Sequence, residues 1–161
     1  MKIKNYPVLF LNQKNLNDRF YTEDSIKNQN GKRVPLVSSF EEDATTLGVA
    51  DLVLTEDKLL ANITVTDENL IALLKTEEGK KTIGFNTVGM ATILNEKTIA
   101  YVEDLKIVSI LKKDSAFSQH HDIELDVDLL SWLEDVKQRV DAMLDKMDDL
   151  TKEEMDELRK L

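Results

Sequence analysis

Seven apolar residues in the last third of this 161-residue chain are separated alternately by four and three positions. Because an α-helix turns once every 3.6 residues, this spacing places all seven on one face of a helix for about three heptads. Charged residues fill most of the positions between them. This apolar stripe consists of Leu129, Leu133, Val136, Val140, Met143, Met147 and Leu150. An isolated helix of this kind is only marginally stable in water, so the apolar stripe is expected to pack against another surface.

Thr151 and Glu154 follow the stripe with the spacing of a capping box, a pattern that begins helices. We therefore expect a tight turn after Leu150 and a second short helix carrying Met155 and Leu158. Three partners for the stripe remain open: the rest of the same chain, a second copy in a coiled coil, and another protein. Trp132 adjoins the stripe and is expected to anchor the tail on the body or to contact the partner.

Negative charge is concentrated in this tail. Residues 121–161 contain 14 acidic and 6 basic residues, whereas the whole chain has a net charge of −10. We therefore divide the chain into a β-rich body, residues 1–120, and an acidic helical tail, residues 121–161. The negative balance argues against nucleic-acid binding, because affinity for phosphate comes mainly from Lys and Arg.

Other compositional features narrow the class of protein. No apolar run approaches the ~18 residues of a membrane-spanning helix. There are no cysteines, which excludes disulfides and cysteine-bound metals, and no motif for a cofactor or metal is found. We expect no cofactor, no membrane and no nucleic acid among the partners.

Strand patterns dominate the body. Residues 6–11 have the pattern of a first strand, and residues 48–65 contain two alternating runs joined at a polar turn, which predicts a β-hairpin. Residues 82–111 read as two long strands that meet near 95–97. These patterns, with the tail, predict an α+β protein.

Short helices are expected between the strands. Thr22 offers a cap for a helix that ends before Gly31. Thr66 or Asp67 offers a cap for a second helix, which Gly79 ends.

Four segments carry motifs in a distinctive order. Residues 15–21, NLNDRFY, precede a helix, and residues 34–65 contain a strand with Pro35 and a hairpin whose first strand contains Gly48. The other two segments are TIGFNTVGM at 82–90 and VEDLKIVSILKKDSAFS at 102–118. Together they resemble the prohead (capsid-maturation) serine proteases of tailed phages. The resemblance implies a β-barrel-like body with helices, similar to the herpesvirus assemblin fold.

The same resemblance implies a catalytic triad that this chain has lost. Phe40 stands where the family carries its catalytic His, Thr82 where it carries the nucleophilic Ser, and Ile107 where an acidic residue is common. A threonine hydroxyl acts as a nucleophile only with a base within hydrogen-bond reach. In the first segment Asp18 replaces the usual Gly, and Asp tolerates a left-handed turn better than most residues.

The two histidines of the chain, His120 and His121, lie outside the segment that holds the family's catalytic His. They would have to fold back toward Thr82 to act as a base. Neighbouring histidines on a helix or strand point in different directions, so we expect a linker here and not a metal site.

These observations favour a non-catalytic phage head morphogenesis protein, a pseudoenzyme that binds the major capsid protein and acts as a scaffold. The expected location is the host cytoplasm during assembly, and then the prohead or virion capsid. Four alternatives remain: an auxiliary capsid protein kept in the virion, an active prohead protease, a capsid-assembly inhibitor and a β-rich binding domain outside phage biology. Homo-oligomerisation through the tail is also expected.

Overall fold

The computed structural model describes residues 1–117, 123–126 and 129–160. It separates into two compact units, residues 1–126 and 127–161. The body therefore extends to Asp126, beyond the boundary predicted at residue 120, because Ile123 is buried in its core and a short strand follows. In chain order the elements are β1 (Lys2–Phe10), α1 (Glu23–Ile26), η1 (Lys27–Gln29), β2 (Arg33–Val37), β3 (Thr46–Leu54), β4 (Lys58–Val65), α2 (Glu68–Leu74), α3 (Glu77–Thr82), β5 (Ile83–Ile93), β6 (Ile99–Leu111), η2 (Lys112–Asp114), β7 (Leu125–Asp126) and α4 (Leu129–Arg159).

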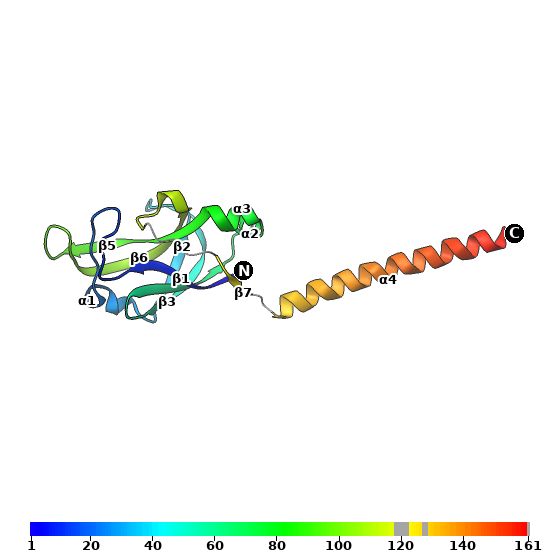
Figure 1. The fold of residues 1–161 in the computed structure, drawn as a ribbon, viewed down its shortest axis with the longest axis horizontal. Coiled ribbons are helices and arrows are strands. Elements are labelled where there is room, and N and C mark those ends of the chain that lie inside the picture. Colours follow the sequence, from blue (N-terminus) through cyan, green and yellow to red (C-terminus); the bar gives the residue numbers. More distant parts are fainter. Residues whose placement is uncertain (118–122, 127–128, 161) are drawn as a thin grey trace. The chain divides into compact units, whose positions relative to one another are not determined.

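The body is a curled, half-barrel sheet with short helices, which confirms the mixed α+β class (Figure 1). Its strand order is β5-β6-β2-β3-β4-β1-β7. Every neighbouring pair is antiparallel except β2 and β6, which run parallel with Leu36 opposite Ile107. The curl brings β1 to β5. The rings of Tyr6 and Phe85 meet edge to face at 5.2 Å, and the Phe85 N–H donates to the Tyr6 hydroxyl at 3.4 Å.

Both predicted hairpins are present. β3 and β4 pair along their length, and their alternating burial reflects one face against the core and one toward solvent. Gly48 is required where the two strands approach each other. A Cβ at this position would lie 2.0 Å from the Thr64 carbonyl oxygen. β5 and β6 form the longer hairpin, which turns at the predicted segment 95–97.

Helix caps agree with the sequence at two sites and differ at a third. Thr22 and Asp67 cap α1 and α2 as predicted. Gly79, however, does not end a helix. α2 ends at Leu74, Thr76 caps a new helix, and Gly79 lies inside α3, where a Cβ would be 1.9 Å from the Leu73 carbonyl oxygen. The glycine allows two helices to meet closely.

The predicted turn after Leu150 is wrong. α4 is a single helix of 31 residues, and Thr151 lies within it (Figure 1). The capping-box pattern begins a helix only where the preceding chain is not already helical. No Gly or Pro occurs between Leu129 and Arg159 to interrupt the helix, and most residues there are good helix formers.

Candidate functional site

The three positions assigned to a lost triad lie in three different structural settings. Phe40 lies just beyond β2 and is 57% exposed, whereas Ile107 is fully buried in the sheet. Thr82 ends α3, and its hydroxyl donates to the Glu78 carbonyl at 2.9 Å, which is a contact within the helix. In strand register the residue opposite Ile107 is Thr87 and not Thr82. The two threonines are five positions apart, which separates them by roughly 15 Å along an extended strand.

A cleft of about 430 Å³ is lined by residues from all four of the motif segments, 15–21, 34–65, 82–90 and 102–118. The first segment contributes Asn15, Arg19 and Tyr21 to its lining, and Phe40 comes from the second. The third contributes Asn86 and Thr87, and the fourth contributes Asp114 and Phe117. Sequence reasoning missed Thr87. The available signal was a second Thr-x-Gly pattern, Thr87-Val88-Gly89, five positions after Thr82.

One wall of the cleft is the loop of residues 15–21, which is held by its own side chains. The Asn15 side-chain oxygen accepts from the backbone N–H groups of Asn17 (3.0 Å) and Arg19 (2.9 Å). Asp18 has φ = 60°, so the left-handed turn expected from the replaced glycine is present. Its carboxylate pairs with Lys97 and, at 3.3 Å, with Lys14. The hydrogen bond from Lys97, assisted by Lys14, holds the pKa of Asp18 below its ordinary value against a smaller opposing effect of burial.

Backbone hydrogen bonds fix this loop to two distant parts of the chain. The Leu16 N–H donates to the Ala116 carbonyl at 2.6 Å, and the Phe20 N–H donates to the Lys97 carbonyl at 2.9 Å. The Ile99 N–H returns a bond to the Phe20 carbonyl at 2.9 Å. The loop therefore ties the β5–β6 hairpin to the segment after β6, and its position is set by backbone geometry.

The lining of the cleft also contains a buried amide. Asn86 is 6% exposed. Oriented so that its oxygen accepts from the Ala116 N–H and its nitrogen donates to the Ser115 hydroxyl, both at 3.1 Å, the amide satisfies its neighbours. The Phe117 N–H in turn donates to the Ser115 hydroxyl at 3.1 Å. Ser115 thus helps to position the Phe117 side of the cleft.

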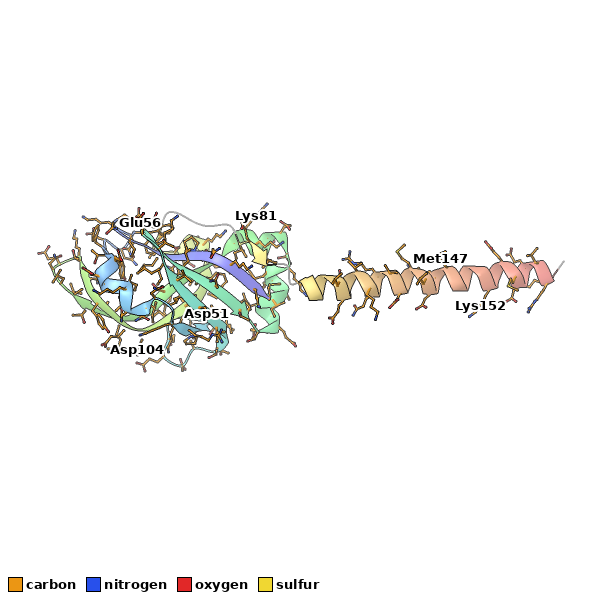
Figure 2. All side chains as sticks on the ribbon, turned by 90° about the horizontal axis from the view of Figure 1, so that it is seen from below. Asp51, Glu56, Lys81, Asp104, Met147 and Lys152 are labelled. Carbon is orange, nitrogen blue, oxygen red and sulfur yellow. The ribbon has the colours of Figure 1, made fainter. Side chains whose placement is uncertain are left out.

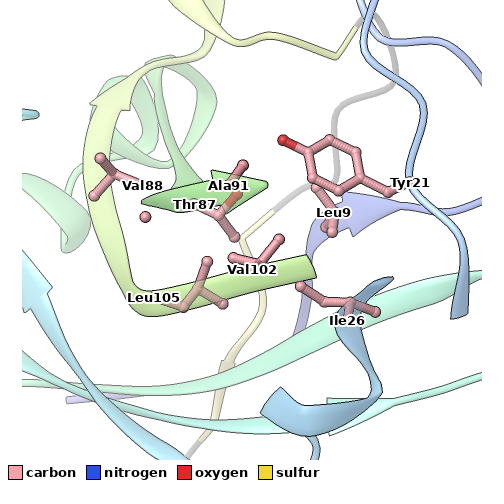
Figure 3. A pocket seen from close by; sticks show the side chains of 9 residues that line it. Leu9, Tyr21, Ile26, Thr87, Val88, Ala91, Val102 and Leu105 are labelled. Atoms are coloured by element: carbon pink, nitrogen blue, oxygen red, sulfur yellow. The ribbon is translucent and has the colours of Figure 1, made fainter. Parts of the chain in front are cut away.

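Beside the cleft is a smaller cavity of about 200 Å³ (Figure 3). Leu9, Ile26, Val102 and Leu105 give it an apolar lining, and Tyr21 and Thr87 line both this cavity and the cleft. Burial raises the pKa of the Tyr21 hydroxyl, and the charge of Arg19 opposes this effect. Together the two linings combine apolar side chains with hydroxyl, amide and guanidinium groups. Such a surface offers both apolar contacts and hydrogen bonds to a bound molecule.

The apolar stripe lies on α4, which belongs to the second compact unit. Leu133, Val140, Met143 and Met147 are exposed and Val136 is half-buried within that unit. Figure 2 shows side chains on all sides of α4, with Met147 and Lys152 on different sides. The side chains of Leu129, Trp132 and Leu150 lie outside the described residues, so their predicted contacts stay predictions.

Within residues 1–117, 123–126 and 129–160, no group of three His, Asp or Glu side chains is placed to hold a metal ion. His120 and His121 lie outside the described residues. Of the helices that the structure describes, none is both long and apolar enough to cross a membrane.

Comparison with models of known protein families, with curated proteins and with solved structures finds no match to this chain.

Proposed function

We propose that this chain is a non-catalytic phage head morphogenesis protein that binds a segment of the major capsid protein in the cleft beside Phe40. The observation that carries the proposal is the convergence of the four resembling segments on that cleft. Segments that are far apart in the sequence contribute neighbouring walls. This arrangement is expected if the segments were kept for one binding surface.

Two further observations support a role without catalysis. The Thr82 hydroxyl is engaged with the Glu78 carbonyl of its own helix, so it is not prepared as a nucleophile. Phe40 places an exposed aromatic ring at the cleft, where an aromatic side chain favours binding of a partner.

The charge distribution fits a scaffold. An acidic helical tail would line the interior of a prohead without holding DNA, and its charge would be repelled by DNA during packaging. A second role, as an auxiliary protein of the mature virion, is favoured by the buried core of the body, since a protein that stays on the shell requires a stable fold.

Quantitative mass spectrometry of purified proheads and virions from the source phage distinguishes these roles. A scaffold is present in proheads and lost from virions, whereas an auxiliary protein is present in both. Absence from both contradicts the proposal and favours an inhibitor of capsid assembly or a chance resemblance.

The cleft itself is tested by Phe40→Asp, with Leu73→Asp as a matched control. Both side chains are apolar and similarly exposed, at 57% and 54%, but Leu73 lies on α2 and does not line the cleft. We expect Phe40→Asp to weaken binding to the purified major capsid protein about tenfold or more, as loss of an aromatic anchor does. Equal binding by the two variants would contradict the assignment of the cleft.

A further inference from the structure

We infer that α4 pairs with α4 of a second copy of this chain, in parallel and in register. The inference does not depend on the proposed role in a capsid. Because α4 is continuous, Met155 and Leu158 belong to the same helix as the apolar stripe. Both are exposed, together with Leu133, Val140 and Met143. An amphipathic helix with such a row of exposed apolar side chains is expected to bury it.

The spacing of the apolar residues along α4 changes at one point, after Leu150. Up to Leu150 it follows heptads, which would next place Glu154 and Glu157 on the apolar face. The apolar residues are instead Met155 and Leu158, one position further along. A partner helix packs continuously across such a phase shift only if its own shift lies at the same level. A second copy in parallel register meets this condition. In an antiparallel pair the shift would face the regular heptads near the start of the other helix.

Charges beside the stripe give an independent argument. With Leu133, Val140 and Met147 at heptad position a, the flanking g positions include Arg139 and Lys146. In a parallel pair each g residue lies near the e residue of the next heptad in the partner. Arg139 then lies near Leu144 and Lys146 near Thr151, so no like charges meet.

An antiparallel pair brings g positions against g positions. In the register with the greatest overlap of heptads, Arg139 of each copy faces Lys146 of the other. Registers shifted by one heptad place Arg139 against Arg139 or Lys146 against Lys146 at the two-fold axis. Each arrangement sets basic side chains together beside the apolar face, which is unfavourable.

Four acidic residues beside the heptads lie on the outside of such a pair. Glu134, Asp135, Asp141 and Asp145 lie at positions b, c and f, away from the stripe. Asp135 pairs with Arg139 of the same helix at 3.0 Å, which moderates the basic charge at the flank. These positions keep the four carboxylates in solvent, away from the apolar interface.

The absence of cysteine makes the arrangement directly measurable in the full-length chain. Light scattering of the unmodified protein is expected to give twice 18.4 kDa. Two separate variants, Val136→Cys and Met143→Cys, each place a cysteine at heptad position d. In a parallel, in-register pair the two identical d residues lie side by side. Both should form disulfide-linked dimers on mild oxidation. Gln138→Cys, at the outer position f, is the matched control and should not.

Each other outcome overturns the inference. A monomer means that the stripe packs on its own body or awaits a different protein. A mass of three or more chains excludes a pair. For orientation, Val136→Cys is mixed with Met147→Cys, because these positions face each other only in an antiparallel pair. Mixed 136–147 disulfides without 136–136 disulfides would therefore show the opposite orientation.

Discussion

Asp18 is a residue at which backbone conformation and charge act together. Its left-handed φ allows the loop of residues 15–21 to turn back. Its carboxylate forms an ion pair with Lys97, which lies at the tip of the β5–β6 hairpin. Glycine would provide the turn without the ion pair. An aspartate at this position therefore adds a side-chain tie between the loop and the hairpin, next to backbone bonds that already join them.

Asp18→Asn is predicted to change the pH dependence of stability, because the pKa of Asp18 is lowered in the folded state. An acidic group with a lowered folded pKa stabilises the folded state at any pH above its unfolded pKa, which is near 3.9 for Asp. This stabilisation is lost as the pH falls through the lower pKa of the folded state. Urea unfolding should show the native protein more stable than Asp18→Asn at pH 7, with the difference closing below about pH 4.

Asp18→Ala provides the control for the backbone. It removes the same carboxylate but tolerates the left-handed conformation less well than Asn does. It should therefore be less stable than Asp18→Asn at every pH. A difference between the native protein and Asp18→Asn that persists unchanged at low pH would exclude the carboxylate as its source.

The candidate site was only partly accessible from the sequence. The resemblance groups Phe40 with Thr82, and of these two residues only Phe40 is part of the cleft lining. Thr82 does not line it, because α3 extends to that residue and withdraws its hydroxyl into a helical contact. Asn86 and Thr87 face the cleft in its place. Which residue of a strand reaches a site depends on where the preceding helix stops, and sequence patterns locate helix ends poorly.

Among the elements, those defined by neighbouring residues were predicted and those defined by distant contacts were not. The β3–β4 and β5–β6 hairpins follow from alternation and a polar turn. The parallel contact of β2 with β6 and the addition of β7 to β1 have no local signature, because alternation identifies a strand but not its neighbour. Gly79 predicts a helix end, whereas α2 ends at Leu74 and Gly79 lies inside α3.

Gly48→Ala tests the close approach of β3 to β4. The added methyl would lie 2.0 Å from the Thr64 carbonyl oxygen, so the strands must separate. We expect a loss of about 3 kcal/mol in the free energy of unfolding, measured in urea. Gly31→Ala is the comparison: its φ of +76° strains alanine, but no atom lies within 4 Å, so a loss of about 1 kcal/mol is expected. The reverse order of the two losses would contradict this account of Gly48.

At the scale of the whole molecule, the body has a core of its own. Apolar residues from all of its long strands, with Ile123 at its end, form one cluster. The tail forms a separate unit. This division implies that the stability of the body resides in residues 1–126.

Truncation tests that division. A chain ending at Asp126 should unfold at nearly the same urea concentration as the full-length protein. A chain ending at residue 120 lacks β7 and Ile123, which is 6% exposed. It should be less stable by about 2 kcal/mol or more, the value of burying such a side chain. Marked destabilisation of the longer fragment would instead indicate that α4 packs on the body.

The parallel contact between β2 and β6 has a consequence for how the chain folds. The hairpins on either side of it close short stretches of chain, whereas pairing Leu36 with Ile107 joins positions about seventy residues apart, at a correspondingly high cost in loop-closure entropy. Local hairpins are therefore expected to form early, and the sheet to become continuous late. Until then the chain consists of two incomplete β-sheets with open edges, and its vulnerability to aggregation during synthesis is concentrated in that interval.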